Sequence, residues 1–408
     1  MASGARHTIG YFDDGSGHGG TTRYLLELLT GLDRSIFHPV YYGFRPAWWH
    51  SKLVERNVEI VLLEPDAPTV PSSPPAPPAT NPAKRKKPRL PKTVAWWLGL
   101  RHDMNDLVRL IEKRPVDLFH SNNAGAEPAP IAARRAGIPR ILATWHVESD
   151  YDFGKTAFRY RWLERRCMKS LDHAIAPAEH TKQDWIRRCS LGAAYEKRVT
   201  VMHYGVSEDR LVRRRSMAEA RTAMGLPQDA LVVGSLGRLE PAKGYEYLIQ
   251  AIPAILAREP RALFVIGGRG YLEESLRQRA AEAGVEHALR FIGFLPEIRD
   301  LLECLDLYIQ PSLCEVTPMS LLEAGGMCVP LAGSDVGGVS EIILHDRNGL
   351  LFPPRDPEKI AAATIALLGD APRRAAMGQA AREWVRESFN LPAMIGRTQA
   401  LYQELLRR

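Results

Sequence analysis

Apolar residues in the first half of the chain gather in short runs, and the stretches between these runs have helical spacing. The first run is His7 to Phe12. Four leucines after it recur at the spacing of one helix face: Leu25, Leu28, Leu29 and Leu32. Further strands are expected over Pro39 to Phe44, Glu59 to Leu63, Asp117 to His120, Arg140 to His146, His173 to Ala176 and Val199 to His203. Strands that alternate with helices predict a parallel, doubly wound sheet.

A second alternating series begins at Leu231. Its expected strands are LVVGSLGRL, ALFVIGG, LRFIGF, LDLYIQ, VPLAG and GLLF, with helices over Tyr245 to Ala257 and near Leu272 to Ala283. The pattern predicts an α/β protein with two Rossmann-like domains, residues 1–206 and 228–385, joined by a linker at 207–227. Residues 386–408 are expected to form a C-terminal helix.

One segment fits neither series. Pro65 to Pro91 holds ten prolines and few apolar side chains, so a disordered or polyproline-like loop is expected at 65–92, inside the first domain. Lys84 to Lys92 carries six basic residues of a chain whose net charge is +7, so the remainder is about neutral. The basic character is therefore local, and it does not describe a nucleic-acid-binding face.

The basic loop at 84–92 and the Trp96-Trp97 pair after it suggest contact with an anionic membrane, because cations and tryptophan both favour that surface. A second cationic stretch, FRYRWLERRCMK, follows, but as a helix its arginines would spread over more than one face. The alternative is a solvated loop with both tryptophans in the core, and the sequence favours neither.

The composition of the 408 residues is that of a globular protein, with 45% hydrophobic and 25% charged residues. No apolar run approaches the roughly 20 residues of a membrane span, and no signal peptide is visible. The five cysteines are scattered without a CxxC pair, which favours a reducing, cytoplasmic location over a disulfide framework or zinc site.

The stretch from Ser312 to Glu341 carries the densest candidate chemistry. Thr317 is the expected N-cap of a helix, Pro318 its first residue, and Gly325-Gly326 its end. The N–H groups of Met319 and Ser320 would then point out of the helix start, where an anion is favoured. Glu315 lies in the loop just before this helix and Glu323 in its first two turns. Taken alone, these two carboxylates would more often be ordinary surface residues.

The region from Pro311 to Glu341 resembles the E-x7-E region of retaining glycosyltransferases of family 4, with Glu315 and Glu323 at the two Glu positions. It departs from that family in having Val316-Thr317 where Gly-Phe is common. The resemblance implies the GT-B fold, in which two Rossmann-like domains face a central cleft and the last helix crosses back to the first domain. It also implies transfer of a sugar from a nucleoside-diphosphate-sugar to an acceptor hydroxyl, with retention of configuration.

By the same resemblance Glu315 binds the donor sugar, Glu323 binds the ribose, and Arg238 and Lys243 in GRLEPAKG stabilise the diphosphate. His146, at the end of ILATWH, lies on the donor-sugar side. The further expected donor contacts are Gly19, Gly20, Gly268, Leu295, Thr317, Pro318, Met319 and Ser320. Leu295 could equally be a core residue, and the role of His120 stays open.

No Asp-x-Asp motif is placed to hold a metal, and no cofactor is expected beyond the nucleotide-sugar, because two cations can neutralise the leaving diphosphate. The acceptor is expected to be a sugar, a lipid-linked glycan or another hydroxyl compound. One alternative is a nucleotide-sugar epimerase or phosphorylase-like enzyme of the same fold. Another is a silent nucleotide-sugar-binding protein, against which the joint presence of the five candidate polar residues argues: His146, Arg238, Lys243, Glu315 and Glu323.

Overall fold

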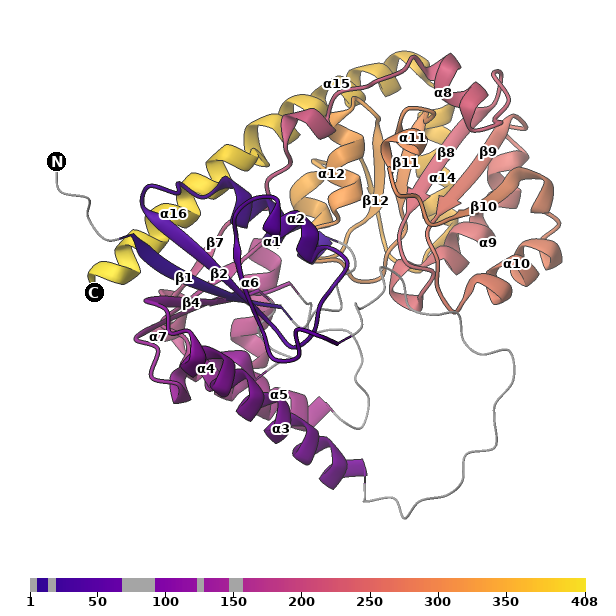
Figure 1. Ribbon diagram of the computed structural model, residues 1–408. Coiled ribbons are helices and arrows are strands. Elements are labelled where there is room, and N and C mark those ends of the chain that lie inside the picture. Colours follow the sequence, from indigo (N-terminus) through magenta and orange to yellow (C-terminus); the bar gives the residue numbers. More distant parts are fainter. Residues whose placement is uncertain (1–5, 14–19, 68–91, 123–127, 147–156) are drawn as a thin grey trace. The chain divides into compact units, whose positions relative to one another are not determined.

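A computed structural model describes residues 6–13, 20–67, 92–122, 128–146 and 157–408; within it, the side chains of 92–98 and 157–161 are not described (Figure 1). The basic residues at 84–91 and Gly19 therefore lie outside the described residues, as do the side chains of Trp96 and Trp97. The chain divides into two compact units. The first unit comprises Met1–Pro177, Lys182–Met202 and Ile395–Arg408, and the second comprises Ala178–Thr181 and His203–Met394.

The first unit is built on a parallel sheet of seven strands in the order β3-β2-β1-β4-β5-β6-β7. The strands are β1 (His7–Phe12), β2 (Phe37–Gly43), β3 (Glu59–Leu62), β4 (Leu118–Ser121), β5 (Arg140–Thr144), β6 (His173–Ala176) and β7 (Val199–Val201). The helices between them are α1 (Gly20–Gly31), α2 (His50–Val54), α3 (Lys92–Lys113), α4 (Ala129–Arg135), α5 (Ala157–Ser170), α6 (Glu179–Arg188) and α7 (Ala193–Glu196). The predicted series of strands is confirmed, with ends that differ by a few residues.

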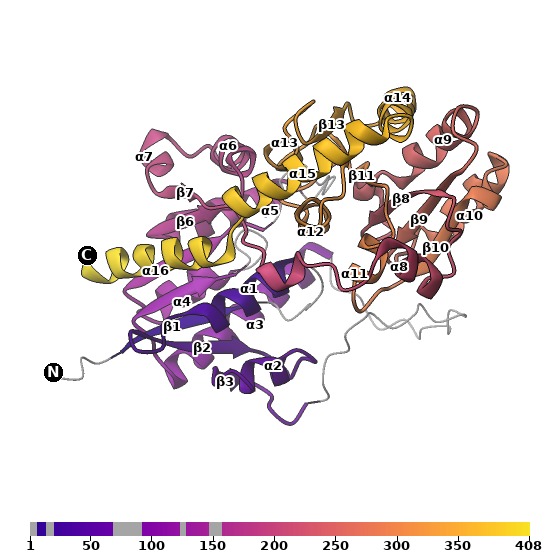
Figure 2. The ribbon, with the colours of Figure 1, turned by 90° about the horizontal axis from the view of Figure 1, so that it is seen from above.

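Alternating residues of this sheet face two different helical layers, as strand geometry requires. Phe119 on β4 packs in an apolar cluster with residues of α3 and α4. The neighbouring His120 points the other way, toward Tyr402 of α16 (Leu391–Arg407). From Ile395 onward α16, the last helix of the chain, belongs to this unit (Figure 2). Ile395 packs so closely on Gly31 of α1 that a side chain at Gly31 would collide with it.

The second unit contains a parallel sheet of six strands in the order β10-β9-β8-β11-β12-β13. The strands are β8 (Leu231–Leu236), β9 (Ala262–Gly267), β10 (Leu289–Gly293), β11 (Leu307–Gln310), β12 (Leu331–Ser334) and β13 (Gly349–Phe352). The helices are α8 (Met217–Ala223), α9 (Tyr245–Leu256), α10 (Glu273–Glu282), α11 (Arg299–Leu302), α12 (Met319–Gly326), α13 (Val339–Ile342), α14 (Pro357–Leu368) and α15 (Ala371–Ser388). Short 3-10 turns lie at η2 (Glu208–Arg210), η3 (Pro241–Lys243) and η4 (Glu286–Ala288).

The strand order of the second unit reverses between β8 and β11. From β8 the chain moves outward through β9 to β10, and it then returns to the other side of β8 with β11. The loops that leave the carboxyl ends of these two strands therefore diverge, and an open parallel sheet binds ligands at such a switch point. The first sheet has its own reversal between β1 and β4.

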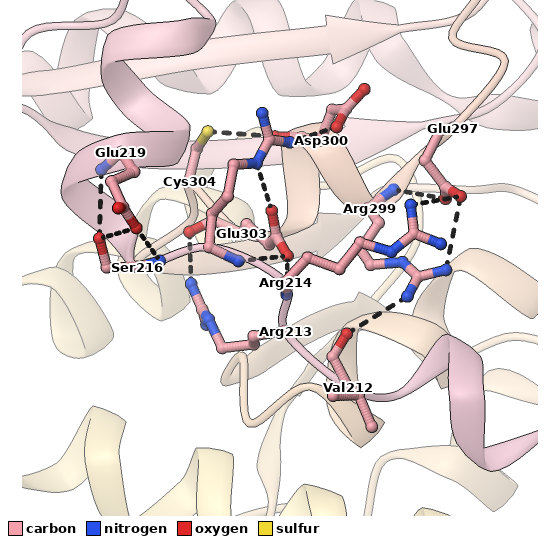
Figure 3. Close-up of polar contacts among 11 residues, drawn as sticks. Val212, Arg213, Arg214, Ser216, Glu219, Glu297, Arg299, Asp300, Glu303 and Cys304 are labelled. Atoms are coloured by element: carbon pink, nitrogen blue, oxygen red, sulfur yellow. Dashed lines mark hydrogen bonds and ion pairs between the residues drawn. The ribbon is translucent and has the colours of Figure 1, made fainter.

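Residues 207–227, expected to be a linker, instead belong to the second unit. They are anchored by Glu303, a buried carboxylate that accepts hydrogen bonds from the backbone N–H of Arg214 at 2.5 Å and from Arg215 Nε at 3.0 Å (Figure 3). The segment then forms α8 behind a capping box in which Ser216 and Glu219 satisfy each other's backbone N–H. The two series of strands predict a linker at this place, but ion pairing with a distant residue orders the segment.

Candidate functional site

The switch point of the second unit brings together the loop after β8 and the loop after β11. The N–H of Leu313 donates to the carbonyl of Ala242 at 2.8 Å. Gly244 has a φ of +63°, and a Cβ atom on it would lie 2.0 Å from the carbonyl oxygen of Pro311. Only glycine allows this approach, because it has no side chain and adopts positive φ without strain. The two loops are therefore held in direct backbone contact.

This contact places Lys243 beside Glu315. One carboxylate oxygen of Glu315, Oε1, accepts hydrogen bonds from Lys243 Nζ at 2.5 Å, from Gln310 Nε2 at 2.7 Å and from Ser312 Oγ at 2.7 Å. The Glu315 side chain is buried, so the three donors fix its orientation. Lys243 and Glu315, predicted separately, form one ion pair, and Gln310 and Ser312 are additions that the sequence analysis missed. Both flank the predicted strand end, which is the signal that could have found them.

The start of α12 differs from the expectation. The N-cap is Pro318, with extended backbone angles, and Thr317 lies one residue before it. Thr317 makes no capping bond, and its buried hydroxyl has no hydrogen-bond partner among the described residues. Met319 and Ser320 are the first two helical residues, as an anion-binding helix start requires, and Ser320 Oγ accepts from the Tyr308 hydroxyl at 2.7 Å.

α12 ends at Gly326, as the sequence predicts. The positive φ of the turn that follows falls on Cys328, at 63°, and on neither glycine. The reason for the glycines is packing: a Cβ on Gly326 would lie 2.4 Å from a methyl of Leu211.

Glu323, between the two helix ends, is almost fully buried and accepts from Arg210 Nε at 2.7 Å and Arg210 Nη2 at 3.3 Å. Sequence reasoning missed Arg210 because it fell in the expected linker.

The remaining predicted residues of this unit lie at the carboxyl ends of β8, β9 and β10. Gly268 has a φ of +135°, and its N–H donates to the carbonyl of Gly293 at 2.7 Å. Leu295 is half-buried beside Gly267. Arg238 has a side chain that is 71% exposed and pairs with Glu240 at 3.1 Å. The structure thus places Arg238 in the same loop as Lys243, with its guanidinium turned to solvent.

In the first unit, His146 follows β5 and is buried. Its Nε2 lies 3.0 Å from Asn122 Oδ1, and Asn122 Nδ2 donates to Asp13 Oδ2 at 2.8 Å. Because the Asn122 amide nitrogen faces Asp13, its oxygen is the acceptor, so His146 carries its proton on Nε2. Asp13 and Asn122 directly follow β1 and β4, the switch-point strands, and their position after a strand could have revealed them. Gly20 is the first residue of α1.

Burial controls the protonation of the histidines in this unit. Loss of solvent, with a smaller contribution from His120, lowers the pKa of His146 to about 3. Burial likewise lowers the pKa of His120 to about 3. His120 lies between Tyr402 at 2.6 Å and Thr144 at 2.8 Å, so the structure gives it partners within the fold. Both imidazoles are neutral near pH 7.

Among the described residues, no three His, Cys, Asp or Glu side chains come together as metal ligands. Within the same part of the chain, no helix has the length and apolar character needed to cross a membrane.

Comparison with known families identifies the chain. Residues 216–384 match the family described as glycosyl transferases group 1, and residues 49–210 match glycosyltransferase family 4. A GDP-mannose-dependent α-(1-6)-phosphatidylinositol monomannoside mannosyltransferase from Mycobacterium tuberculosis is 31% identical over 274 residues, which cover 63% of this chain and 69% of that protein. The chain belongs to the family 4 glycosyltransferases of group 1.

Two further comparisons agree with this assignment. An uncharacterized glycosyltransferase from Methanocaldococcus jannaschii is 31% identical over 220 residues; the match spans 53% of this chain and 56% of that protein. The crystal structure of HepE from Anabaena in complex with UDP and glucose superposes with a TM-score of 0.77 at 18% identity, covering 98% of this chain and 100% of that one. The second comparison concerns the fold, which is GT-B as predicted.

The loop contact at Gly244 can be tested by adding one methyl group. Gly244→Ala should lower the free energy of unfolding by about 3 kcal/mol, the sum of the positive-φ cost and the collision with Pro311. Gly225→Ala is the matched control, because Gly225 has a φ of +62° and open space around it. That variant should lose only about 1 kcal/mol in urea unfolding. Equal losses for the two variants would show that the loop contact contributes nothing.

Acid should destabilise the protein through His146 and His120. Their pKa values rise from about 3 in the folded state to about 6.5 on unfolding, so the unfolded chain binds more protons between these values. The free energy of unfolding should therefore fall as pH drops below 6.5, by up to about 1.4 kcal/mol per pH unit for each residue. His146→Gln should reduce the pH dependence of the free energy of unfolding, measured by urea unfolding between about pH 7.5 and about pH 5. An unchanged slope would contradict the assignment.

Proposed function

We propose that this protein is a retaining glycosyltransferase that moves a sugar from a nucleoside-diphosphate-sugar to an acceptor hydroxyl without a metal ion. The observation that carries the proposal is the Lys243–Glu315 pair at the switch point of the second sheet. It combines a cation for the diphosphate with a carboxylate for sugar hydroxyls in one rigid loop junction. The α12 start, with Met319 and Ser320, adds backbone donors for the phosphates.

The ion pair also suggests the order of events at the donor. Without donor, Lys243 is neutralised by Glu315; a bound diphosphate would compete for the ammonium group and leave Glu315 to accept from sugar hydroxyls. Arg238, exposed in the same loop, can turn toward the same phosphates. Negative charge grows on the diphosphate as its bond to the sugar breaks, so both cations stabilise the transition state more than the ground state.

The proposed transfer needs no nucleophile from the protein. The bond between the anomeric carbon and the diphosphate oxygen breaks, the bond to the acceptor oxygen forms on the same face, and the acceptor proton passes to the departing phosphate oxygen. His146 contributes a neutral imidazole in a fixed tautomer, which can orient a hydroxyl of the donor sugar.

An epimerase or phosphorylase-like enzyme remains the second candidate for this fold, and it differs in what it consumes. An epimerase would convert the nucleotide-sugar without any acceptor alcohol. A phosphorylase would require inorganic phosphate. The site favours transfer, because Lys243, Arg238 and the α12 start gather donors for a leaving diphosphate.

The central test is transfer by variants of the ion pair, after a panel of UDP-, GDP- and ADP-sugars has identified the donor by thermal shift. Lys243→Ala and Glu315→Gln should each lower kcat/KM by roughly 100-fold, since each removes a charge-assisted contact. Arg261→Ala, which removes an exposed cation before β9, should keep wild-type activity. Product NMR should show retained configuration, and excess chelator should leave the rate unchanged. Wild-type turnover by both variants, or rescue of a chelated enzyme by manganese, would refute the proposal.

We also propose that the first unit contacts an anionic membrane surface through α5. Among its described side chains, the exposed ones follow helical spacing on a single face: Trp162, Arg165, Arg166 and Lys169. The Arg166 guanidinium lies 4.9 Å from the centre of the Trp162 ring. Leu163 and Cys167 on the opposite face pack inward. The described cations of α5 therefore lie on one face; Arg159 and Arg161, which the expected spread also counted, are outside the described side chains. The mannosyltransferase relative is named for a phospholipid acceptor.

Membrane contact predicts a large effect of the α5 cations on vesicle binding. Replacing Arg165, Arg166 and Lys169 with Ser should weaken binding to phosphatidylserine-containing vesicles about 100-fold, since each cation contributes about 1 kcal/mol. Affinity for the donor nucleotide should not change.

The control variant removes the same charge from the second unit, through Ser at the exposed Arg258, Arg261 and Arg290. It should bind vesicles like the wild type. If both variants weaken vesicle binding equally, the effect depends on net charge and not on the position of the cations. If the wild type does not bind vesicles, the membrane proposal is wrong.

A further inference from the structure

The carboxylate of Glu323 is held by a residue from a remote part of the chain. Its side chain is 1% exposed, and Arg210, 113 positions earlier, approaches it with two nitrogens, Nε at 2.7 Å and Nη2 at 3.3 Å. A buried carboxylate without a counter-charge would be strongly unfavourable. The planar guanidinium also defines the plane of the carboxylate, which a single ammonium group could not do.

Arg210 is itself held in place before any ligand binds. It ends the 3-10 turn η2, whose Glu208 pairs with Arg386 of α15. The carbonyl of Asp209 accepts from Arg299 Nη1 at 2.8 Å. Two other elements of the second unit thus fix the turn, so Arg210 presents its guanidinium to Glu323 with little remaining freedom.

We propose that Arg210 is a positioning residue for recognition of the donor ribose by Glu323. The inference rests on the proposed function, which assigns the ribose hydroxyls to Glu323. Arg210 holds that carboxylate in one plane through two hydrogen bonds, so that it accepts from the hydroxyls in a fixed direction. Residues 207–227, which contain Arg210, therefore take part in nucleotide recognition in addition to their structural role.

The same segment contains a matched ion pair that has no place in this proposal. Arg215 donates to Glu303, whose side chain is also 1% exposed, with Nε at 3.0 Å. Glu303 precedes β11, whereas Glu323 lies in the helix that follows the carboxyl end of β11, where the candidate site is. The two arginines therefore share burial of the partner and position in the segment, and differ in their relation to the site.

The experiment compares Arg210→Gln with Arg215→Gln in the full-length protein. Binding of UDP, GDP and ADP, each with its 2′-deoxy and 3′-deoxy counterpart, is measured by calorimetry. For the nucleotide that binds, the wild type should prefer the ribose form at least about tenfold, as a charge-assisted hydrogen bond implies. Arg210→Gln should reduce this preference to about twofold or less, on the same scale. Arg215→Gln should retain it, although both variants are expected to unfold at lower urea concentration.

A second variant keeps the test valid if Arg210→Gln does not fold. Arg210→Lys keeps the charge without the planar fork, and it should lose part of the ribose preference. If the folded Arg210 variants keep the full ribose preference while Glu323→Gln loses it, the positioning role of Arg210 is wrong and the ribose assignment of Glu323 stands. A wild type that binds a nucleotide without ribose preference would overturn the ribose assignment and this inference with it. If the Arg210 and Arg215 variants lose the ribose preference equally, the loss reflects general destabilisation, and Arg210 has no positioning role.

Discussion

The candidate donor site depends on the backbone contact between the loops after β8 and β11. Gly244 lies against the carbonyl of Pro311, and the N–H of Leu313 bonds to Ala242. This contact sets the distance between Lys243 and Glu315, two side chains that would otherwise leave the sheet on diverging paths. A charge pair in such a place needs a rigid support, because a small displacement of either partner costs most of its interaction energy.

Three of the candidate residues, Lys243, Glu323 and His146, are each held by a partner from another segment of the chain. Lys243 pairs with Glu315, Glu323 pairs with Arg210, and His146 is oriented by Asn122 and Asp13. Burial makes these partners necessary, since a charged or polar group removed from water must find a compensating contact. The same burial lowers the pKa of His146 and keeps its imidazole neutral. Positioning and electrostatic tuning thus have one physical origin.

The departures from expectation share a cause as well. Thr317 has the side chain of an N-cap, yet Pro318 holds that position. Gly325-Gly326 ends the helix as expected, but these glycines serve close packing and do not supply a positive φ. The backbone at Pro318 is extended, so the helix begins only after it. Leu211 fills the space that a side chain at Gly326 would need. Residues 207–227 were expected to be a linker, but several of their arginines pair with acidic residues far along the chain, at Glu297, Asp300, Glu303 and Asp306. Propensity is a weak guide wherever contacts of long range compete with it.

The sequence by itself determined the order of strands and helices, the presence of two doubly wound sheets and the main candidate residues of the donor site. These features are encoded locally, in apolar periodicity and in the residues that follow each strand. The tertiary structure alone decided which residues meet those candidates. Lys243 and Glu315 are 72 positions apart, and Arg210 and Glu323 are 113 apart. Their pairing follows from the spatial order of the strands and from close backbone packing, which no short stretch of sequence specifies.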